Sequence, residues 1–179
     1  VSSQGNNSEE KHNGYDSTLT ELTFNDYYNA YIGMRFENII IPQGAEIEEA
    51  YLEFTAYQHR TGWGASFNIA AANVDDAEDY SPHQRYMLKD VAKTDSVNWN
   101  NIPAWYKNND YQSPSLKSVI QQVIDRDGWQ AGNAMALIVS DITGTRGAYS
   151  YDGKPSGAPR LVIKYRGDAT PESVSTVRD

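Results

Sequence analysis

The chain has 179 residues, no cysteine and a formal net charge of -9. This length is enough for one domain with a sizeable core, and the lack of cysteine excludes disulfides, thiol catalysis and cysteine-based zinc sites. The 15 basic residues are scattered and outnumbered by 24 acidic ones, which disfavours nucleic acid and anionic membrane surfaces as partners. No apolar run approaches the roughly 20 residues of a membrane-spanning helix, so no membrane insertion is expected.

Polar segments are predicted at both ends of the chain. Residues 1–16 are nearly free of aliphatic side chains, and residues 167–179 are also largely polar. Such compositions are typical of a tail or linker, so we expect a single folded domain over residues 17–166. Because the chain starts at Val1 and shows no signal peptide, we interpret it as a processed or excised piece of a larger protein.

Strand patterns dominate the predicted domain. Ile32, Met34 and Phe36 alternate with Tyr31 and Arg35 along the chain. This period of two is typical of a β-strand with one face on the core. The apolar set is therefore predicted to face the core, and Tyr31 and Arg35 are predicted to face outward.

A second alternating strand is predicted over residues 50–57. Its inward positions are all apolar, namely Ala50, Leu52, Phe54 and Ala56. Its outward positions are Tyr51, Glu53, Thr55 and Tyr57. Further strands are predicted at residues 19–24, 39–41, 67–71, 97–99, 134–142, 147–151 and 161–165. We therefore expect an all-β fold, a jelly-roll-like β-sandwich of about eight antiparallel strands with one short α-helix.

The single helix is predicted over residues 115–124. Its apolar stripe has the spacing of one helix face and consists of positions 116, 119, 120, 123 and 124. Ser113, which precedes Pro114, is the predicted N-cap. A lone helix in a sandwich usually closes one open end of the core, and we expect that role here.

Five segments carry a resemblance to a known family. They are residues 33–36 with 41–45, 50–54, 97–104, 116–139 and 158–165. The most specific is Val97-Asn98-Trp99-Asn100-Asn101-Ile102-Pro103-Ala104. In this order, the segments resemble the secreted bacterial modules called DNRLRE domains, which are grouped with carbohydrate-binding modules that recognise alginate-type polysaccharides.

The resemblance implies a jelly-roll sandwich in an extracellular or cell-surface protein, next to catalytic or adhesive domains. The chain departs from the family pattern at residues 25–30, 57–64 and 75–95. These segments are predicted loops, where ligand contacts would lie. The resemblance therefore indicates the fold more strongly than the ligand.

Exposed aromatic residues are the main functional signal. Flat rings stack on the apolar face of a sugar, while amide, guanidinium and carboxylate groups bond its hydroxyls. Trp63 lies between two glycines on a predicted loop, where a tryptophan has little packing reason to occur. The outward tyrosines of neighbouring strands could join into a platform, although tyrosine also simply coats strands. The predicted ligand-binding residues are Trp63, Tyr57, Tyr51, Tyr31, Arg35, Arg60 and His59.

The charge of the ligand is left open by the sequence. A neutral polysaccharide would be bound mainly by the aromatic residues. An acidic polysaccharide would need local positive charge in a protein of net charge -9. The basic residues predicted for that case are Arg35, His59, Arg60, Arg85 and Lys89.

A structural calcium ion is a further prediction. Jelly-roll modules often carry one that ties the first strand to the last, and Ca²⁺ takes oxygen ligands. Glu21 near the start, with Asp141 or Asp152 near the end, could supply such ligands. The acidic residues 73–79 are an alternative, but they lack EF-hand spacing, and acidic loops are usually just solvated.

The sequence contains neither Gly-x-Ser-x-Gly nor His-Glu-x-x-His. Paired carboxylates for glycoside hydrolysis stay open, since they need not be adjacent in sequence. With neither motif present, we expect a non-catalytic carbohydrate-binding module of a larger extracellular protein, whose partners are a polysaccharide and the neighbouring domains. The alternative is a structural or adhesive subunit of an extracellular filament or matrix. In that case residues 1–16 would be a tether, and residues 19–24 would pair with a neighbouring subunit by β-augmentation.

Overall fold

The computed structural model describes residues 7–11, 14–16, 20–26, 30–62, 64–80, 87–166 and 173–178. Within them the chain forms an all-β sandwich with three antiparallel sheets. Twelve strands are described: β1 (Asn7–Lys11), β2 (Gly14–Asp16), β3 (Glu21–Asn25), β4 (Tyr31–Phe36), β5 (Glu46–Thr55), β6 (Ala65–Ala71), β7 (Val97–Ile102), β8 (Asp110–Gln112), β9 (Met135–Thr143), β10 (Thr145–Tyr149), β11 (Arg160–Arg166) and β12 (Ser173–Arg178). The helices are α1 (Met87–Asp90), α2 (Lys117–Ile124) and the 3₁₀ turn η2 (Pro155–Gly157).

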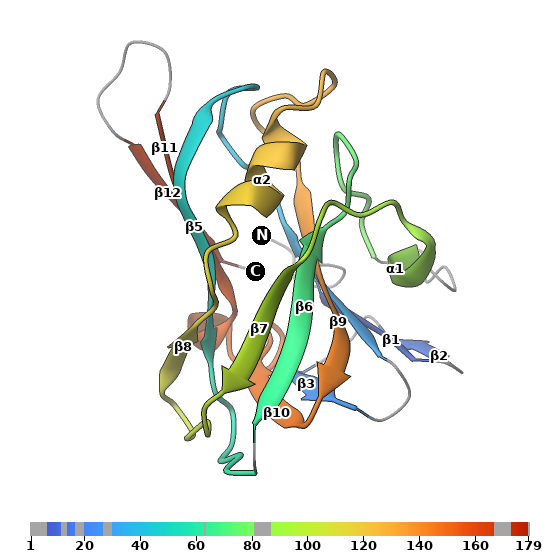
Figure 1. Cartoon of the computed structure of the whole chain (residues 1–179), viewed down its shortest axis with the longest axis vertical. Helices are drawn as coiled ribbons and strands as arrows, with labels where there is room; N and C mark the ends of the chain where they lie inside the picture. Colours follow the sequence, from blue (N-terminus) through green and yellow to red (C-terminus); the bar gives the residue numbers. More distant parts are fainter. Residues whose placement is uncertain are drawn as a thin grey trace.

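Two sheets form the layers of the sandwich. The six-stranded sheet has the order β2-β1-β4-β9-β6-β7, and the four-stranded sheet has the order β12-β11-β5-β8. The pair β10-β3 lies at the lower end of the molecule (Figure 1). A single bridge between Ala56 and Ala148 connects this pair to the end of β5.

The core lies between the two sheets and is built by the predicted alternation. Ile32 and Met34 of β4 and Leu52 and Phe54 of β5 are fully buried. Aromatic rings fill the lower half of the core, with centroid distances of 4.9 to 6.2 Å among Phe24, Phe54, Phe67, Trp99, Trp105 and Tyr111. Each such pair adds about 0.5–1.5 kcal/mol beyond area burial.

Helix α2 closes the upper end of the core, as predicted (Figure 1). Its buried residues are Val119, Ile120, Val123 and Ile124. The helix begins later than expected, and its N-cap is Leu116. Ser113 does not cap it, because its hydroxyl accepts a bond from the N–H of Leu52 and donates to the carbonyl of Pro114.

The sandwich extends beyond the predicted residues 17–166 at both ends. β1 pairs with β4, and β12 pairs with β11. The expected polar tails therefore contribute strands. Pairing uses main-chain N–H and C=O groups, so it leaves little hydrophobic signal in the sequence. No helix in the described part of the chain has the length and apolar character needed to span a membrane.

Candidate functional site

A polar groove of about 240 Å³ lies on the outer face of the four-stranded sheet, near the lower end. Its lining residues are Glu53, Thr55, Asn108, Asp110, Ser156, Ala158 and Arg160. Only one of these side chains is apolar. The groove therefore presents hydrogen-bonding groups on a face that is open to solvent.

Strand register brings these residues together. Because Phe54 points into the core, its neighbours Glu53 and Thr55 point outward. Pairing with β11 places Arg160 opposite Glu53, and pairing with β8 places Asp110 opposite Thr55.

The groove side chains hold one another in position. Arg160 forms an ion pair with Glu53, and the Thr55 hydroxyl donates to Asp110 Oδ1 at 2.6 Å. A partly exposed ion pair adds at most about 1 kcal/mol to stability. Its effect here is orientation, since each carboxylate keeps acceptor sites for a further hydrogen bond.

Asn108 joins the groove to a pair of tyrosines. Its Oδ1 atom accepts from the Tyr149 hydroxyl at 3.2 Å and from Lys154 Nζ at 3.3 Å. The ring of Tyr149 stands edge-to-face with that of Tyr57, with centroids 6.3 Å apart. Lys154 Nζ also lies 4.6 Å from the centre of the Tyr149 ring. The φ angle of Asn108 is 65°, in the left-handed region that asparagine tolerates better than most residues.

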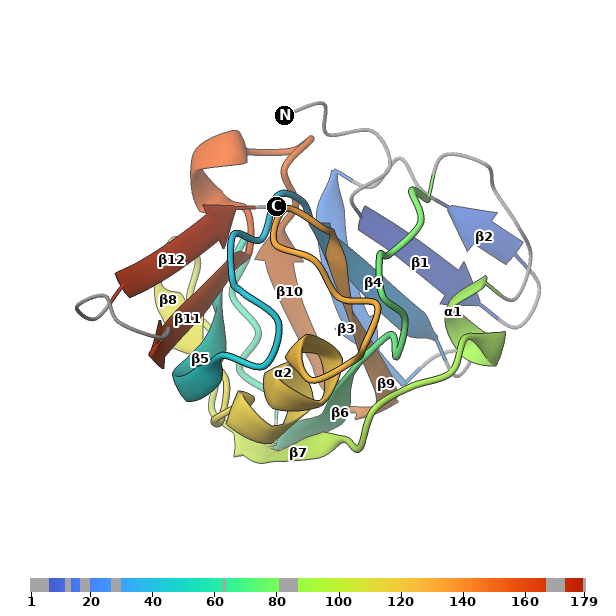
Figure 2. The ribbon, with the colours of Figure 1, turned by 90° about the horizontal axis from the view of Figure 1, so that it is seen from above.

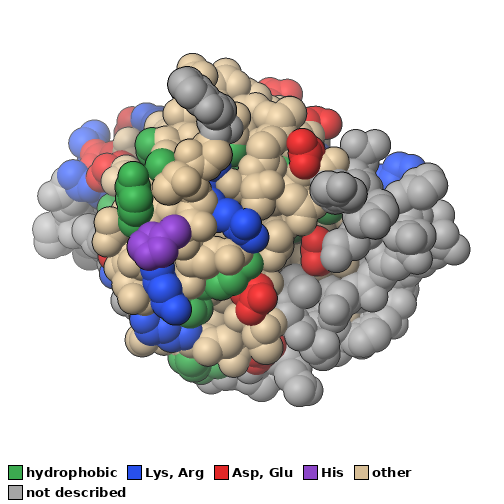
Figure 3. All heavy atoms as spheres, turned by 90° about the horizontal axis from the view of Figure 1, so that it is seen from below, with side chains coloured by type: hydrophobic (Ala, Val, Ile, Leu, Met, Phe, Trp, Pro, Cys, Tyr) green, Lys and Arg blue, Asp and Glu red, His purple; other side chains and the backbone are tan. Residues whose placement is uncertain are grey.

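A second aromatic contact lies at the tips of the lower loops. His59 and Tyr106 stand edge-to-face at 5.9 Å, and His59 Nδ1 accepts from the N–H of Lys107 at 3.3 Å. Tyr106 is 48% exposed, a large fraction for such a ring. In the view from below, hydrophobic and basic side chains surround the purple histidine (Figure 3). The loop tips are thus aromatic and locally basic in an acidic protein.

A buried arginine supports these loops. Arg146 is 1% exposed, and its guanidinium donates to the carbonyls of Pro103 at 2.8 Å, Ile102 at 2.6 Å, Thr145 at 2.6 Å and Gly62 at 3.4 Å. Burial lowers the pKa of Arg146 from its ordinary value, although arginine remains charged in proteins. The bonds connect the loops after β5 and β7 to β10. The sequence carried no sign of this role, because an isolated arginine beside Gly147 resembles an exposed residue.

Three of the predicted ligand-binding residues meet at this end of the molecule. Tyr57, His59 and Arg60 follow β5 directly, and Tyr51 lies on the same outer face two positions before Glu53. Sequence reasoning missed several other residues of the site, which pairing brings from distant parts of the chain: Asn108, Asp110, Tyr106, Tyr149, Lys154 and Arg160. Trp63 and Arg85 lie outside the described residues.

Tyr31 and Arg35 do not join this site. They belong to β4, which pairs with β1 and β9 in the six-stranded sheet, whereas β5 belongs to the other sheet. The expected platform across both strands is therefore not formed. Arg35 Nε instead donates to the carbonyl of Ala77 at 2.8 Å, and Lys93 Nζ lies 5.5 Å from the centre of the Tyr31 ring. Lys89 is on α1, which packs on this same sheet.

The predicted calcium ligands are divided between two places. The register of β3 and β10 sets Glu21 beside Tyr149, the last residue of β10. Asp152 follows that same end, whereas Asp141 precedes the start of β10 and accepts from Asn68 Nδ2 at 2.8 Å. Among the described residues, no group of three or more histidine or acidic side chains is arranged to hold a metal. Calcium binding stays a prediction.

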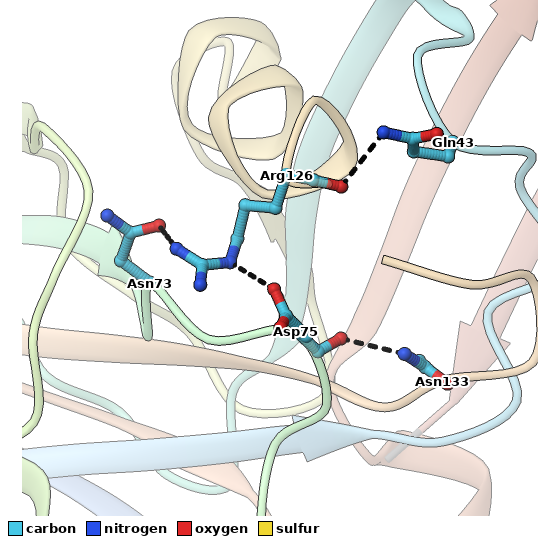
Figure 4. Close-up of polar contacts among 5 residues, drawn as sticks. All are labelled: Gln43, Asn73, Asp75, Arg126 and Asn133. Carbon is cyan, nitrogen blue, oxygen red and sulfur yellow. Dashed lines mark hydrogen bonds and ion pairs between the residues drawn. The ribbon is translucent and has the colours of Figure 1, made fainter. Parts of the chain in front are cut away.

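The acidic residues 73–79 contain a structural contact (Figure 4). Asp75 pairs with Arg126 Nε at 2.6 Å, and Arg126 Nη1 donates to Asn73 Oδ1 at 2.8 Å. Asn133 Nδ2 donates to the carbonyl of Asp75 at 2.9 Å. The Asp75 carboxylate thus fastens the start of this segment to the chain just after α2.

No protein-family model and no curated protein matches the chain.

Proposed function

We propose that this protein is a non-catalytic polysaccharide-binding domain of a larger extracellular protein. Its binding site would be the groove on the four-stranded sheet together with the tyrosines at the groove's lower end. The observation that carries this proposal is the continuity of the two features through Asn108, which lines the groove and bonds to Tyr149.

The chemistry of a sugar ring suits this arrangement. Its hydroxyls both donate and accept, so they can bond to carboxylates such as Glu53 and Asp110 and to the Arg160 guanidinium. Its apolar face can stack on an exposed ring such as Tyr106. Because the groove runs over an exposed sheet face, a chain of sugars could lie along it without entering the core.

The experiment is affinity electrophoresis through gels that contain a panel of neutral and uronic-acid polysaccharides. At least one polymer should retard the protein. Tyr106→Ala should weaken that retardation about tenfold, the value of one good ring contact, and Asp110→Ala should weaken it as well. The control is Ile40→Ala, because Ile40 is 63% exposed and is not one of the residues that line the groove. No retardation by any polymer, or equal effects of the site and control variants, would contradict the proposal.

Assembly through the N-terminal arm finds less support. β3 is paired with β10 of the same chain, and its side chains Leu22 and Phe24 are fully buried. Donating this strand to a neighbour would remove both side chains from the core, at about 2–5 kcal/mol each. We expect a monomer in light scattering, and assembly that depends on residues 19–24 would favour the alternative.

A further inference from the structure

A second and larger pocket, of about 510 Å³, lies on the other side of the sandwich. Its floor is the outer face of the six-stranded sheet, where Ala136 and Ile138 of β9 point outward. Its walls include Tyr80, Met87 and Leu88, which belong to the segment that links β6 to β7. The volume is within the range of pockets that bind small molecules.

The described parts of the connection between β6 and β7, residues 72–80 and 87–96, form a covering segment that contacts β4 closely and leaves a space beside β9. At Gly33 of β4 the contact is tight, since a Cβ atom there would lie 2.6 Å from both Leu88 Cδ2 and the Tyr80 hydroxyl. Over β9 a space remains beside Ala136 and Ile138. Figure 2 shows α1 outside the six-stranded sheet, on the side of β1 and β4, the two strands that it contacts.

The covering segment is fastened around the pocket. Asp75 pairs with Arg126 at its start (Figure 4), and main-chain hydrogen bonds of 2.7 and 3.0 Å join its two ends to each other and to β6. The carboxylate of Glu10, from β1, accepts from the N–H groups of Leu88 and Lys89 at 2.8 and 3.3 Å. Connections this long are uncommon in compact domains.

The charged side chains that line the pocket are all acidic. Asp75, Asp76 and Glu78 line it, and no lysine or arginine does so among the residues that the structure describes. Asp75 is compensated by Arg126, and Asp76 accepts from the N–H of Ala134 at 2.7 Å. Glu78 is exposed at the same pocket. A ligand with an apolar body and one positive charge would complement the apolar walls of the pocket and the Glu78 carboxylate.

We propose that this pocket binds a small ligand that carries an apolar body and a cationic amine, with the amine at Glu78. The site is independent of the polysaccharide groove, because the two lie on the outer faces of different sheets. Failure of one proposal therefore leaves the other standing.

The test is calorimetric titration of the full chain with two probes of nearly the same shape, 4-phenylbutylamine and 4-phenylbutyrate. The amine should bind at least about tenfold more tightly than the carboxylate, since the charge that faces Glu78 is reversed. No binding of the amine, or equal binding of the two probes, would overturn the proposal.

Variants locate the site. Glu78→Gln removes an exposed charge and should weaken amine binding about two- to fivefold, the range of an exposed ion pair. Glu49→Gln, on the exposed surface of β5, is the matched control and should change nothing. Ala136→Phe should place a ring on the floor of the pocket and block binding. If that variant fails to fold, the comparison of Glu78→Gln with Glu49→Gln still tests the site. Equal effects of these two variants on amine binding would refute the assignment.

Discussion

Arg60 and Trp105 exchange two main-chain hydrogen bonds, in which the N–H of Arg60 donates to the Trp105 carbonyl at 2.7 Å and the N–H of Trp105 donates back at 2.9 Å. Trp105 is fully buried and stacks on Tyr111 with centroids 4.9 Å apart. The exposed neighbours His59 and Tyr106 are thereby mounted on a loop pair that is anchored in the core. A binding surface at these loop tips would be ordered before any ligand arrives, which lowers the entropic cost of binding.

Arg146 should be a major contributor to stability. Arg146→Met would leave the buried carbonyl of Ile102 without this donor, at about 1–3 kcal/mol, and would remove the part-buried bonds to Pro103, Thr145 and Gly62. We therefore expect a loss of roughly 3 kcal/mol in the free energy of unfolding. Urea denaturation measures this loss. Arg166→Met is the control, because Arg166 is exposed and its ion pairs with Glu46 and Glu48 should contribute at most about 1 kcal/mol. Similar losses in the two variants would show that the carbonyl contacts of Arg146 are unimportant.

Gly147 should control the position of Tyr57, one of the two tyrosines beside the groove. A Cβ atom at Gly147 would lie 2.2 Å from Cε1 of Tyr57, so Gly147→Ala must displace that ring from its contact with Tyr149. We expect polysaccharide retardation to weaken severalfold. Unfolding should change by less than about 1.5 kcal/mol, because the ring is only half-buried. Affinity electrophoresis and urea denaturation of the same variant separate the two effects, and unchanged retardation would remove Tyr57 from the site.

Alternation in the sequence predicted which side chains enter the core, because it depends only on local geometry. Ile32 and Phe54 are buried as expected, and Tyr51 lies on the outer face. Alternation does not say which strands become neighbours. That choice separated Tyr31 from Tyr51 and brought Arg160 to the groove.

Strands without an apolar pattern were the second feature that the sequence did not predict. Glu9 and Glu10 of β1 are nearly fully buried in the structure, although their segment reads as a polar tail. Their order comes from pairing with β4, together with the contact of Glu10 with the start of α1. Both are tertiary interactions that no local pattern announces. The same limit applied to the candidate site. The sequence could not show that Tyr106, next to Trp105, would lie beside His59, because main-chain pairing between two distant loops brings them together.

Lys93 should make the stability of the protein rise with pH in the alkaline range. Burial lowers the pKa of Lys93 from its ordinary value, while Glu10 and Asp90 oppose this shift. The native state therefore releases the proton of Lys93 at lower pH than the unfolded state does. Between the two pKa values the unfolded state binds more protons, and the free energy of unfolding increases with pH.

The measurement is the difference in unfolding free energy between the wild type and Lys93→Met, taken from about pH 8 to about pH 11, a range that spans the ordinary lysine pKa. Taking the difference cancels the titration of groups that both proteins share. We expect the wild type to gain relative to the variant as the pH rises through this range. A difference that falls with pH would mean that Glu10 and Asp90 outweigh desolvation and that Lys93 is stabilised as a cation. A constant difference would mean that Lys93 titrates equally in both states, and its half-buried position would then have no electrostatic consequence.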